Sequence, residues 1–411
     1  MSSLKVPNGL PGLLFYTCVA SIAMTLGCGG SDFSTLKTSQ GRGRVGVLLA
    51  SHGDIDDLSE LESYIKTAFQ NNVGIPLPGW IRGPITEPAY RLSVNTVRKQ
   101  YEQIGPTKYR DKAKMQADAV TAALARLGIK GKAYFGANFT FPSISDALDQ
   151  MRNDGVDQIL VFNKGGQFSY ASSGENMDDV LKYLNDHPDW DVEAIGRFEY
   201  SEDERFREVM ASAIERDLNT NFAGVPADQV CVLIASHGLP KWLTDKGDPA
   251  IRQMRRTFHW LEAKFSGYRL YHGFLNDDFI PGGKWVKPDA KAVAEQMRAD
   301  GCVNVLMDGR LSFTNHHRAT LYDLNLVARD VLEAKNQGSA ESRSSKVILA
   351  PNFDTDPAYA QLMAELSREA LARSGDIVVL KERGKAALKD GSISTPGNFA
   401  DDFKRFVWPL Q

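Results

Sequence analysis

The stretch Val45-Gly-Val-Leu-Leu-Ala-Ser-His52-Gly53 recurs later in the chain as Val230-Cys-Val-Leu-Ile-Ala-Ser-His237-Gly238, with seven of its nine positions unchanged. Each copy is a short apolar run, typical of a buried strand, that ends in a histidine and a glycine turn. Open α/β sheets bind their ligands at the carboxyl ends of parallel strands. The repeat therefore predicts a duplicated chain in which each half places a histidine at a ligand-binding edge.

The rest of the chain alternates short apolar runs with longer segments of helical spacing. The predicted strands cover residues 45–50, 132–136, 158–162, 230–235, 268–271, 303–307, 347–350 and 377–380. Such alternation is typical of parallel sheets flanked by helices. We therefore predict an α/β fold of two similar doubly wound, Rossmann-like domains with an inter-domain cleft. The first domain is placed at residues 44–200 and the second at 201–375, followed by a C-terminal extension over 376–411.

The composition is that of an ordinary globular protein. The 411 residues are 43% hydrophobic and 24% charged, with 48 Lys and Arg against 51 Asp and Glu. These values exclude a disordered, a collagen-like and a multi-span membrane protein, and the length suits two domains. A formal charge of −3 gives no electrostatic reason to expect a nucleic-acid partner, so none is predicted.

The amino-terminal segment has the features of an export signal. Lys5 is the only charged residue before Asp32, and residues 13–27 form a mostly apolar run that is too short to span a bilayer comfortably. The run ends before Cys28, which follows a glycine and precedes a Gly/Ser/Thr-rich stretch, as in bacterial lipoprotein processing sites. We expect residues 1–27 to be a signal peptide, Cys28 to carry the lipid, and residues 28–43 to be a flexible tether.

We then expect an exported protein that faces the periplasm and contacts the membrane only through this anchor. Two alternatives stay open, because Thr25 stands where lipoprotein sites usually have an aliphatic residue. One alternative is ordinary secretion. The other is a misassigned start codon, which would make the protein cytoplasmic.

The two remaining cysteines, Cys231 and Cys302, are expected in the core. Four cysteines, at positions 18, 28, 231 and 302, are too few and too dispersed for a disulfide framework or for a cysteine-ligated zinc or iron–sulfur site. Cys231 and Cys302 lie at or beside predicted strands, where small apolar side chains pack well.

Four of the seven histidines are candidates for a site. His237 follows a buried strand and precedes a Gly and Pro turn, so its side chain is held rigidly at the sheet edge. Neutral imidazole near pH 7 serves as a base or as a metal ligand. His316 and His317 precede a predicted helix, and adjacent side chains point in different directions, so we expect one of the pair in the site. His52, in the first copy, is the fourth candidate. For His237, the structural alternative is a strand-end histidine that bonds only its own turn.

Two loops carry aromatic and polar side chains at strand ends. The loop after the predicted strand 158–162 contributes Gln167, Phe168, Ser169 and Tyr170. A second loop, rich in Gly and Lys, contributes Trp285. Such side chains offer flat surfaces and hydrogen-bonding groups to a ligand, and we predict that they bind substrate. Plain capping loops are the alternative.

Taken in order, five segments resemble the ferrochelatases, which insert divalent metals into tetrapyrroles. Residues 230–240, followed by Gly247-Asp248-Pro249, resemble the family's strand, catalytic-histidine turn and Gly-Asp-Pro helix start. Residues 282–288 and 313–323 are similar to its Gly-Pro…Trp-Leu…Pro segment and its Phe-Val-Ser-Asp-His…Glu-Thr-Leu-Tyr-Glu helix start. Residues 167–174 resemble its Pro-Gln-Tyr-Ser…Thr-Gly-Ser loop, and residues 101–105 its Ile-Gly-Gly turn. The likeness runs from about residue 45 to residue 374.

The resemblance implies two chelatase-type domains with the macrocycle between them, and a ferrochelatase-like lyase linked to haem biosynthesis. It implies that His237 and His317 are catalytic, and that His237, His316 and Asp323 bind the metal. The expected partners are a porphyrin or other tetrapyrrole and a divalent metal, Fe²⁺ first, which is a substrate. No tightly bound cofactor is expected, and the lack of a cysteine cluster near the carboxyl end speaks against an iron–sulfur centre.

Two departures from the family pattern leave alternatives open. Ala319 stands where the family has a catalytic glutamate, and Val327 interrupts the helix face on which Asp323 lies. Ser51-His52-Gly53-Asp54 replaces a Gly-Thr-Pro-like turn. The protein is then either a chelatase in which His316 or His317 stands in for the glutamate, or an exported lipoprotein that binds tetrapyrrole or metal without catalysis. A cobalt or nickel chelatase acting on another tetrapyrrole is a third alternative.

Overall fold

The two copies of the repeat form central strands of two separate sheets. The computed structural model describes residues 43–71, 79–275, 283–334, 345–372 and 378–381, which all belong to one unit, Gly43–Gln411. Strand β1 (Arg44–Ser51) contains the first copy and strand β5 (Val230–His237) the second. Each has a parallel partner on both sides, as the apolar runs predicted.

The first sheet has the strand order β2-β1-β3-β4-β9. Strands β2 (Gly131–Ala137), β1, β3 (Val156–Asn163) and β4 (Glu193–Arg197) run parallel to one another. Strand β9 (Val378–Lys381) pairs antiparallel with β4 at the edge. The described part of the predicted C-terminal extension therefore completes the first sheet.

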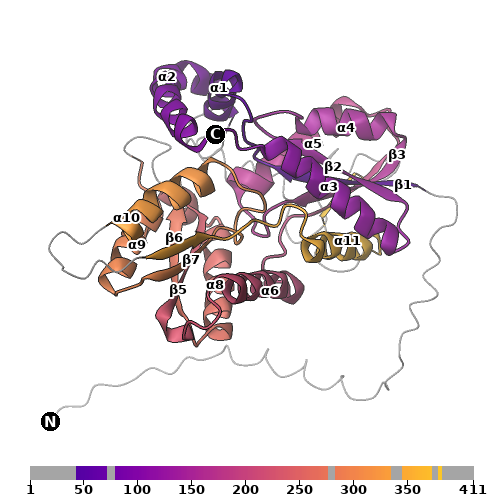
Figure 1. Cartoon of the computed structure of the whole chain (residues 1–411). Coiled ribbons are helices and arrows are strands. Elements are labelled where there is room, and N and C mark those ends of the chain that lie inside the picture. The colour runs from indigo at the N-terminus through magenta and orange to yellow at the C-terminus, as the bar shows by residue number, and fades with distance from the viewer. Residues whose placement is uncertain (1–42, 72–78, 276–282, 335–344, 373–377, 382–411) are drawn as a thin grey trace, which may run out of the picture. The chain divides into compact units, whose positions relative to one another are not determined.

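The second sheet has the strand order β6-β5-β7-β8, and its strands are all parallel. The three strands beside β5 are β6 (Arg269–Leu275), β7 (Asn304–Asp308) and β8 (Lys346–Leu349). Helices pack on the faces of both sheets (Figure 1). The predicted α/β fold with two parallel-sheet halves is confirmed, with β9 as the one antiparallel strand among those described.

The helices that follow the strands include several of the predicted segments. The α-helices are α1 (Leu61–Asn71), α2 (Gly79–Ile104), α3 (Tyr109–Arg126), α4 (Ile144–Asn153), α5 (Glu175–Asp186), α6 (Glu204–Asn221), α7 (Lys241–Asp245), α8 (Ala250–Lys264), α9 (Ala290–Ala299), α10 (Arg329–Glu333) and α11 (Pro357–Leu371). Shorter or wider helical segments are η2 (Leu58–Glu60), η3 (Tyr170–Gly174), η4 (Ala227–Gln229) and η5 (Ala319–Ala328), of which η3 and η5 are π-helices.

Strand β1 is buried on both of its faces. Val47 and Leu49 point into a core cluster that they share with α3 and α6, whereas Leu48 and Ala50 point into a second cluster, shared with α4 and α5. This division follows from the alternation of side chains along a strand. A strand covered by helices on both sides has no polar face, which explains why the repeat is a continuous apolar run.

Helix α11 follows the second sheet in the sequence but packs against α3 of the first half (Figure 1). Met363 and Leu366 of α11 belong to the same cluster of buried side chains as Val120 and Leu124 of α3. Late segments of the chain therefore take part in the first half twice, through α11 and through β9. The domain boundaries at residues 200 and 375 stay a prediction.

A disulfide joins Cys231 of β5 to Cys302, which precedes β7. Both side chains are buried in the core, as predicted, with exposed fractions of 0% and 4%. The sequence predicted them only as packing residues, so the bond between them was not predicted. Their separation of 71 residues conceals that β5 and β7 are neighbours in the sheet.

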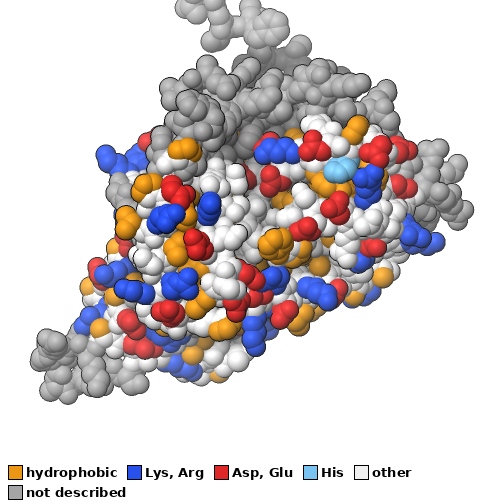
Figure 2. All heavy atoms as spheres, turned by 90° about the horizontal axis from the view of Figure 1, so that it is seen from above, with side chains coloured by type: hydrophobic (Ala, Val, Ile, Leu, Met, Phe, Trp, Pro, Cys, Tyr) orange, Lys and Arg blue, Asp and Glu red, His pale blue; other side chains and the backbone are white. Residues whose placement is uncertain are grey.

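The predicted signal peptide, Cys28 and the tether to residue 42 lie outside the described residues. Among the helices that the structure describes, none has the length and apolar character that crossing a membrane requires. On the face seen in Figure 2, Lys and Arg side chains are interspersed with Asp and Glu.

Candidate active site

One pocket is lined by residues that follow the central strands of both sheets. Its walls include residues 51–54 at and after the end of β1, residues 163–165 at and after the end of β3, and residues 237, 239 and 240 at and after the end of β5. Residues 312–315, 317 and 318, which lie between β7 and η5, complete the wall on the second half. This is the sheet edge at which α/β proteins bind ligands, as the position of the repeat predicted.

A glycine fixes the turn after each strand-end histidine. Gly53 has a φ of +93°, and a Cβ at this position would lie 2.2 Å from Cγ2 of Thr140. A Cβ on Gly238 would lie 2.5 Å from the carbonyl oxygen of Leu275. That oxygen accepts a hydrogen bond of 2.8 Å from the Gly238 N–H. Gly53 is therefore required by its positive φ and by the packing of Thr140, and Gly238 by the close approach of the Leu275 backbone. The two turns hold His52 and His237 in place.

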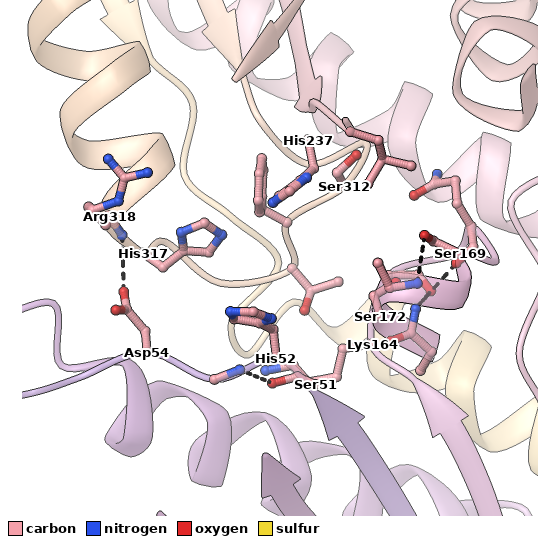
Figure 3. Close-up of a pocket in the computed structure, with 18 of the residues that line it drawn as sticks. Ser51, His52, Asp54, Lys164, Ser169, Ser172, His237, Ser312, His317 and Arg318 are labelled. Atoms are coloured by element: carbon pink, nitrogen blue, oxygen red, sulfur yellow. Dashed lines mark hydrogen bonds between the residues drawn. The ribbon is translucent and has the colours of Figure 1, made fainter. Parts of the chain in front are cut away.

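The three histidines His52, His237 and His317 line this pocket together (Figure 3). Burial and, to a lesser extent, the neighbouring His237 lower the pKa of His52 to about 3. Burial also lowers the pKa of His237 to about 4. The pKa of His317 falls well below its usual range, first through burial and then through His237. All three rings are therefore neutral at pH 7 and carry no charge that would repel a cation.

His317 is held in a defined orientation and tautomer. Its Nδ1 accepts a hydrogen bond of 3.1 Å from the backbone N–H of Ala319, so the proton of the neutral ring is on Nε2. The ring of Phe313 packs edge-on against His317 at a centroid distance of 4.3 Å. The same ring lies 5.8 Å from that of His237. In this arrangement His317 offers an N–H donor, and it cannot accept a proton at Nδ1 without losing the Ala319 bond.

Asp54 is the only acidic side chain among the described residues that line the pocket. Its carboxylate accepts hydrogen bonds from the Tyr101 hydroxyl and from the Ile55 N–H at 2.8 Å. It also accepts a bond of 3.0 Å from the Arg318 N–H (Figure 3). Burial outweighs these bonds and raises the pKa of Asp54 to about 6. The carboxyl group is therefore close to its titration point near neutral pH.

Four of the six residues predicted to bind substrate line the pocket: Gln167, Ser169, Trp285 and His52. Phe168 and Tyr170 are not among the lining residues, and their backbone N–H groups donate instead to Gln253 at 2.9 Å and to Asp248 at 2.9 Å. Asp248 also accepts the Ser169 hydroxyl at 2.8 Å. Asp248 of the Gly-Asp-Pro segment thus fixes the loop after β3 through Ser169 and Tyr170.

His316 and Asp323 are not among the residues that line the pocket. Nδ1 of His316 lies 3.2 Å from the Thr320 hydroxyl, and the Asp323 carboxylate lies 3.4 Å from the guanidinium of Arg318. Within the described ranges, no group of three or more His, Cys, Asp or Glu side chains is arranged to hold a metal ion. His237, His316 and Asp323 therefore do not form a preformed triad, and their role with the metal stays a prediction.

Sequence reasoning missed three charged residues of the pocket wall: Asp54, Lys164 and Arg318. Asp54 and Lys164 each follow a buried strand closely, and a lone charge at the carboxyl end of an apolar run was the signal that could have found them. Arg318 had no such signal, because its place depends on contacts with the other half of the molecule.

A model of the ferrochelatase family matches residues 44–372 of the chain. The chain belongs to the ferrochelatase family. The family predicted from five short segments is thereby confirmed.

The ferrochelatase of Geobacter metallireducens is 26% identical over 331 residues, which cover 80% of this chain and 98% of the relative. That of Nostoc punctiforme is 24% identical over 333 residues, covering 80% and 83%. Among solved structures, SirB from Bacillus subtilis with Fe3+ covers 80% of this chain and 96% of its own, at 14% identity and a TM-score of 0.48.

Membership of the ferrochelatase family supports a tetrapyrrole metal chelatase in general. Ala319, which stands where the family has a catalytic glutamate, lies in the core of this protein. Ala319 is 0% exposed, belongs to a core cluster with Phe313 and Leu324, and is not among the lining residues of the pocket. The only carboxylate on the described wall comes instead from the first half, at Asp54.

Proposed function

We propose that this protein inserts a divalent metal, Fe²⁺ first, into a porphyrin, in a reaction linked to haem biosynthesis. The observation that carries the proposal is the gathering of His52, His237 and His317, all neutral, in one pocket at the carboxyl ends of two parallel sheets. Both the metal and the porphyrin are substrates. Family membership over residues 44–372 supports the same chemistry.

Metal insertion breaks two pyrrole N–H bonds, forms metal–nitrogen bonds in their place and releases two protons. His237 has the most direct part in this step, because its neutral ring can bind the incoming cation or take a pyrrole proton. Its pKa of about 4 makes it a weak base, so a proton taken from the macrocycle passes on quickly to solvent. His317 offers its Nε2–H to a macrocycle bound in the pocket and so helps to orient the macrocycle.

The pocket also has the apolar walls that a flat macrocycle needs. Trp285, Leu239 and Met254 line it from the second half, and Ile65 and Val97 from the first. Aromatic and aliphatic side chains favour a large apolar ring by removing both from water. The polar groups then fix the orientation of the ring within the pocket.

A second candidate function is non-catalytic binding of a tetrapyrrole or a metal by an exported lipoprotein. It is favoured by Ala319, whose side chain has no acid–base function and faces the core. A third candidate is insertion of cobalt or nickel into another tetrapyrrole. The three candidates differ in whether metallation occurs and with which ion.

One experiment separates these functions. The full chain is incubated without oxygen with a porphyrin and Fe(II), Co(II), Ni(II) or Zn(II), and the Soret and Q bands are followed. We expect metallation with Fe(II), and a loss on the order of 100-fold or more in His237→Ala, the range that one acid–base group supplies. His316→Ala and Asp323→Asn test the two predicted metal ligands that lie away from the wall.

The matched control is His259→Ala. His259 is an exposed histidine on α8 that lies 3.1 Å from Glu262, so its loss should leave the rate unchanged. Tight porphyrin binding without metallation by the wild-type chain would establish the second candidate. Turnover with Co(II) or Ni(II) alone would establish the third, and metallation that survives in His237→Ala would overturn the role of His237.

We propose further that the protein is exported and anchored by a lipid on Cys28. The apolar run 13–27 before Cys28 supports this, and so does the Cys231–Cys302 disulfide, because disulfides persist mainly in oxidising compartments. Labelling with a radioactive fatty acid should mark the wild-type protein and not Cys28→Ser. An unlabelled, cytoplasmic wild-type protein would contradict the proposal and favour a later start codon.

A further inference from the structure

Lys164 is a buried cation in the wall of the pocket. It follows the carboxyl end of β3 directly and is 3% exposed. Its Nζ donates to the side-chain oxygen of Asn315 in the second half. Nζ also lies 4.9 Å from the ring centroid of Tyr109 and 5.2 Å from that of Phe135. Among the described residues, Nζ thus contacts one neutral oxygen and two ring faces.

The charge of Lys164 has no close counter-ion. No carboxylate in the described part of the chain lies within ion-pair distance, 4 Å, of its Nζ. Asp354 attracts it only from a distance, since its carboxylate accepts the Asn315 amide at 2.7 Å and lies 3.9 Å from Lys112. An ammonium group that loses its water without gaining a carboxylate is costly. Burial accordingly lowers the pKa of Lys164 to about 7.

The other charged groups of the pocket do not neutralise this cation. Arg318 is positive as well, and its own guanidinium has Asp323 at 3.4 Å. The three histidines are neutral, and the carboxylate of Asp54 is engaged by three hydrogen bonds. An anion that entered the pocket would therefore find its strongest unmet attraction at Lys164.

Two polar atoms of the wall also have no partner among the described residues. They are the Ser312 hydroxyl oxygen and the indole nitrogen of Trp285, and both are buried. The backbone of Ser312 lies close to Gly165, the residue after Lys164, because a Cβ on Gly165 would come 3.4 Å from the Ser312 carbonyl oxygen. Both atoms can donate a hydrogen bond, and so can Lys164. At Ser312 and Trp285 the wall thus presents two donors for which the described residues supply no acceptor.

We propose that Lys164 binds a carboxylate substituent of the tetrapyrrole inside the pocket, and so selects macrocycles that carry free acid groups. The inference rests on the proposed function in one respect, that the ligand is a tetrapyrrole. Lys164 is then a specificity-determining residue: the carboxylate supplies the counter-ion that the described residues do not provide, and it anchors one edge of the ring. A charge-assisted hydrogen bond in a buried site strongly favours such a group over a neutral one.

The test compares a porphyrin dicarboxylic acid with its dimethyl ester, which lacks the charge. The full chain is titrated with each compound in the same detergent and without metal, and binding is followed by the Soret shift. We expect the acid to bind more tightly than the ester by on the order of 10- to 100-fold. In Lys164→Met the affinity for the acid should fall to that for the ester, while the affinity for the ester is unchanged.

The matched control is Lys132→Met. Lys132 on β2 also lies over a ring, with its Nζ 4.6 Å from the centroid of Tyr134, but it is half-exposed and paired with Asp154, away from the pocket. It should keep the full preference for the acid.

Equal binding of acid and ester by the wild-type chain would overturn the role of Lys164 and leave the proposed function intact. So would a preference that persists in Lys164→Met. The comparison of acid and ester uses the wild-type chain, so the role of Lys164 can be overturned even if Lys164→Met fails to fold. Binding of neither compound would instead defeat the proposed function, and with it the selection by Lys164.

Discussion

The carboxylate of Asp54 accepts a hydrogen bond of 3.0 Å from the backbone N–H of Arg318, although 264 residues separate the two in the chain. The bond connects the turn after β1 to the residue before η5. The guanidinium of Arg318 also donates to Gln100 of α2 at 2.8 Å. One residue of the second half is thus held by two elements of the first, and the pocket wall is continuous across the two sheets.

Asp54 should make stability depend on pH. Its pKa is about 6 in the folded protein and roughly 3.9 in an unfolded chain. The folded state therefore keeps a proton that the unfolded state has lost, and the free energy of unfolding should fall as pH rises from about 4 to about 6, by up to about 3 kcal/mol. Urea unfolding across this range should show a weaker fall in Asp54→Asn. Asp56→Asn, two residues away and outside the lining, should keep the wild-type slope; parallel slopes for all three proteins would contradict the prediction.

Ala319→Glu should destabilise the protein and should not create a better catalyst. Position 319 is fully buried among apolar side chains, so the new carboxylate would enter the core and not the pocket. Overpacking and an unpaired buried charge together should cost at least about 2 kcal/mol. Val327→Glu, on the same helix but only half-buried, is the control and should cost clearly less. A variant at 319 that is as stable as wild type and metallates faster would refute this account.

Arg310 should be the most sensitive charged residue of the second half. It is 1% exposed, and its guanidinium lies 2.5 Å from the carboxylate of Asp308 and 2.7 Å from that of Asp217. Removing the cation leaves two buried carboxylates uncompensated, so Arg310→Met should lose about 3–5 kcal/mol in urea unfolding. Arg216→Met breaks the more exposed pair with Asp356 and should lose less than about 1 kcal/mol. Similar losses in the two variants would count against the prediction.

Cys231 and Cys302, joined as a disulfide, should not react with alkylating reagents in the folded protein. Both sulfurs are buried, so peptide mapping after alkylation without denaturant should find neither position modified. After unfolding in reductant, both positions should react. The bond links residues 71 apart, and a double Cys→Ala variant should lose about 2–4 kcal/mol. Alkylation of either cysteine in native, unreduced protein would show that the bond is not formed.

The fold followed from the sequence because its decisive signals are local. The repeat at Val45 and Val230 marks the two central strands, and burial on both faces explains why each run is continuously apolar. The return of α11 and β9 to the first sheet had no local signal, since it depends on which buried faces meet after folding. The disulfide was missed for the same reason.

The site followed from the sequence only in part. His52 and His237 could be predicted because a strand end fixes where they lie, and of the adjacent pair the structure places His317 on the wall. The contributions of Asp54 and Lys164 depend on burial and on partners in the other half, Arg318 and Asn315, which spacing along the chain does not reveal.

The return of the chain to its first sheet makes the two copies inseparable. A first half produced alone would leave the edge of β4 bare and the α3 surface uncovered, and bare strand edges promote aggregation. A proteolytic nick between the halves would leave two fragments that hold each other through the β4–β9 ladder and the α3–α11 contact. The two halves of the duplicated sequence should therefore fold and unfold together and not as independent domains.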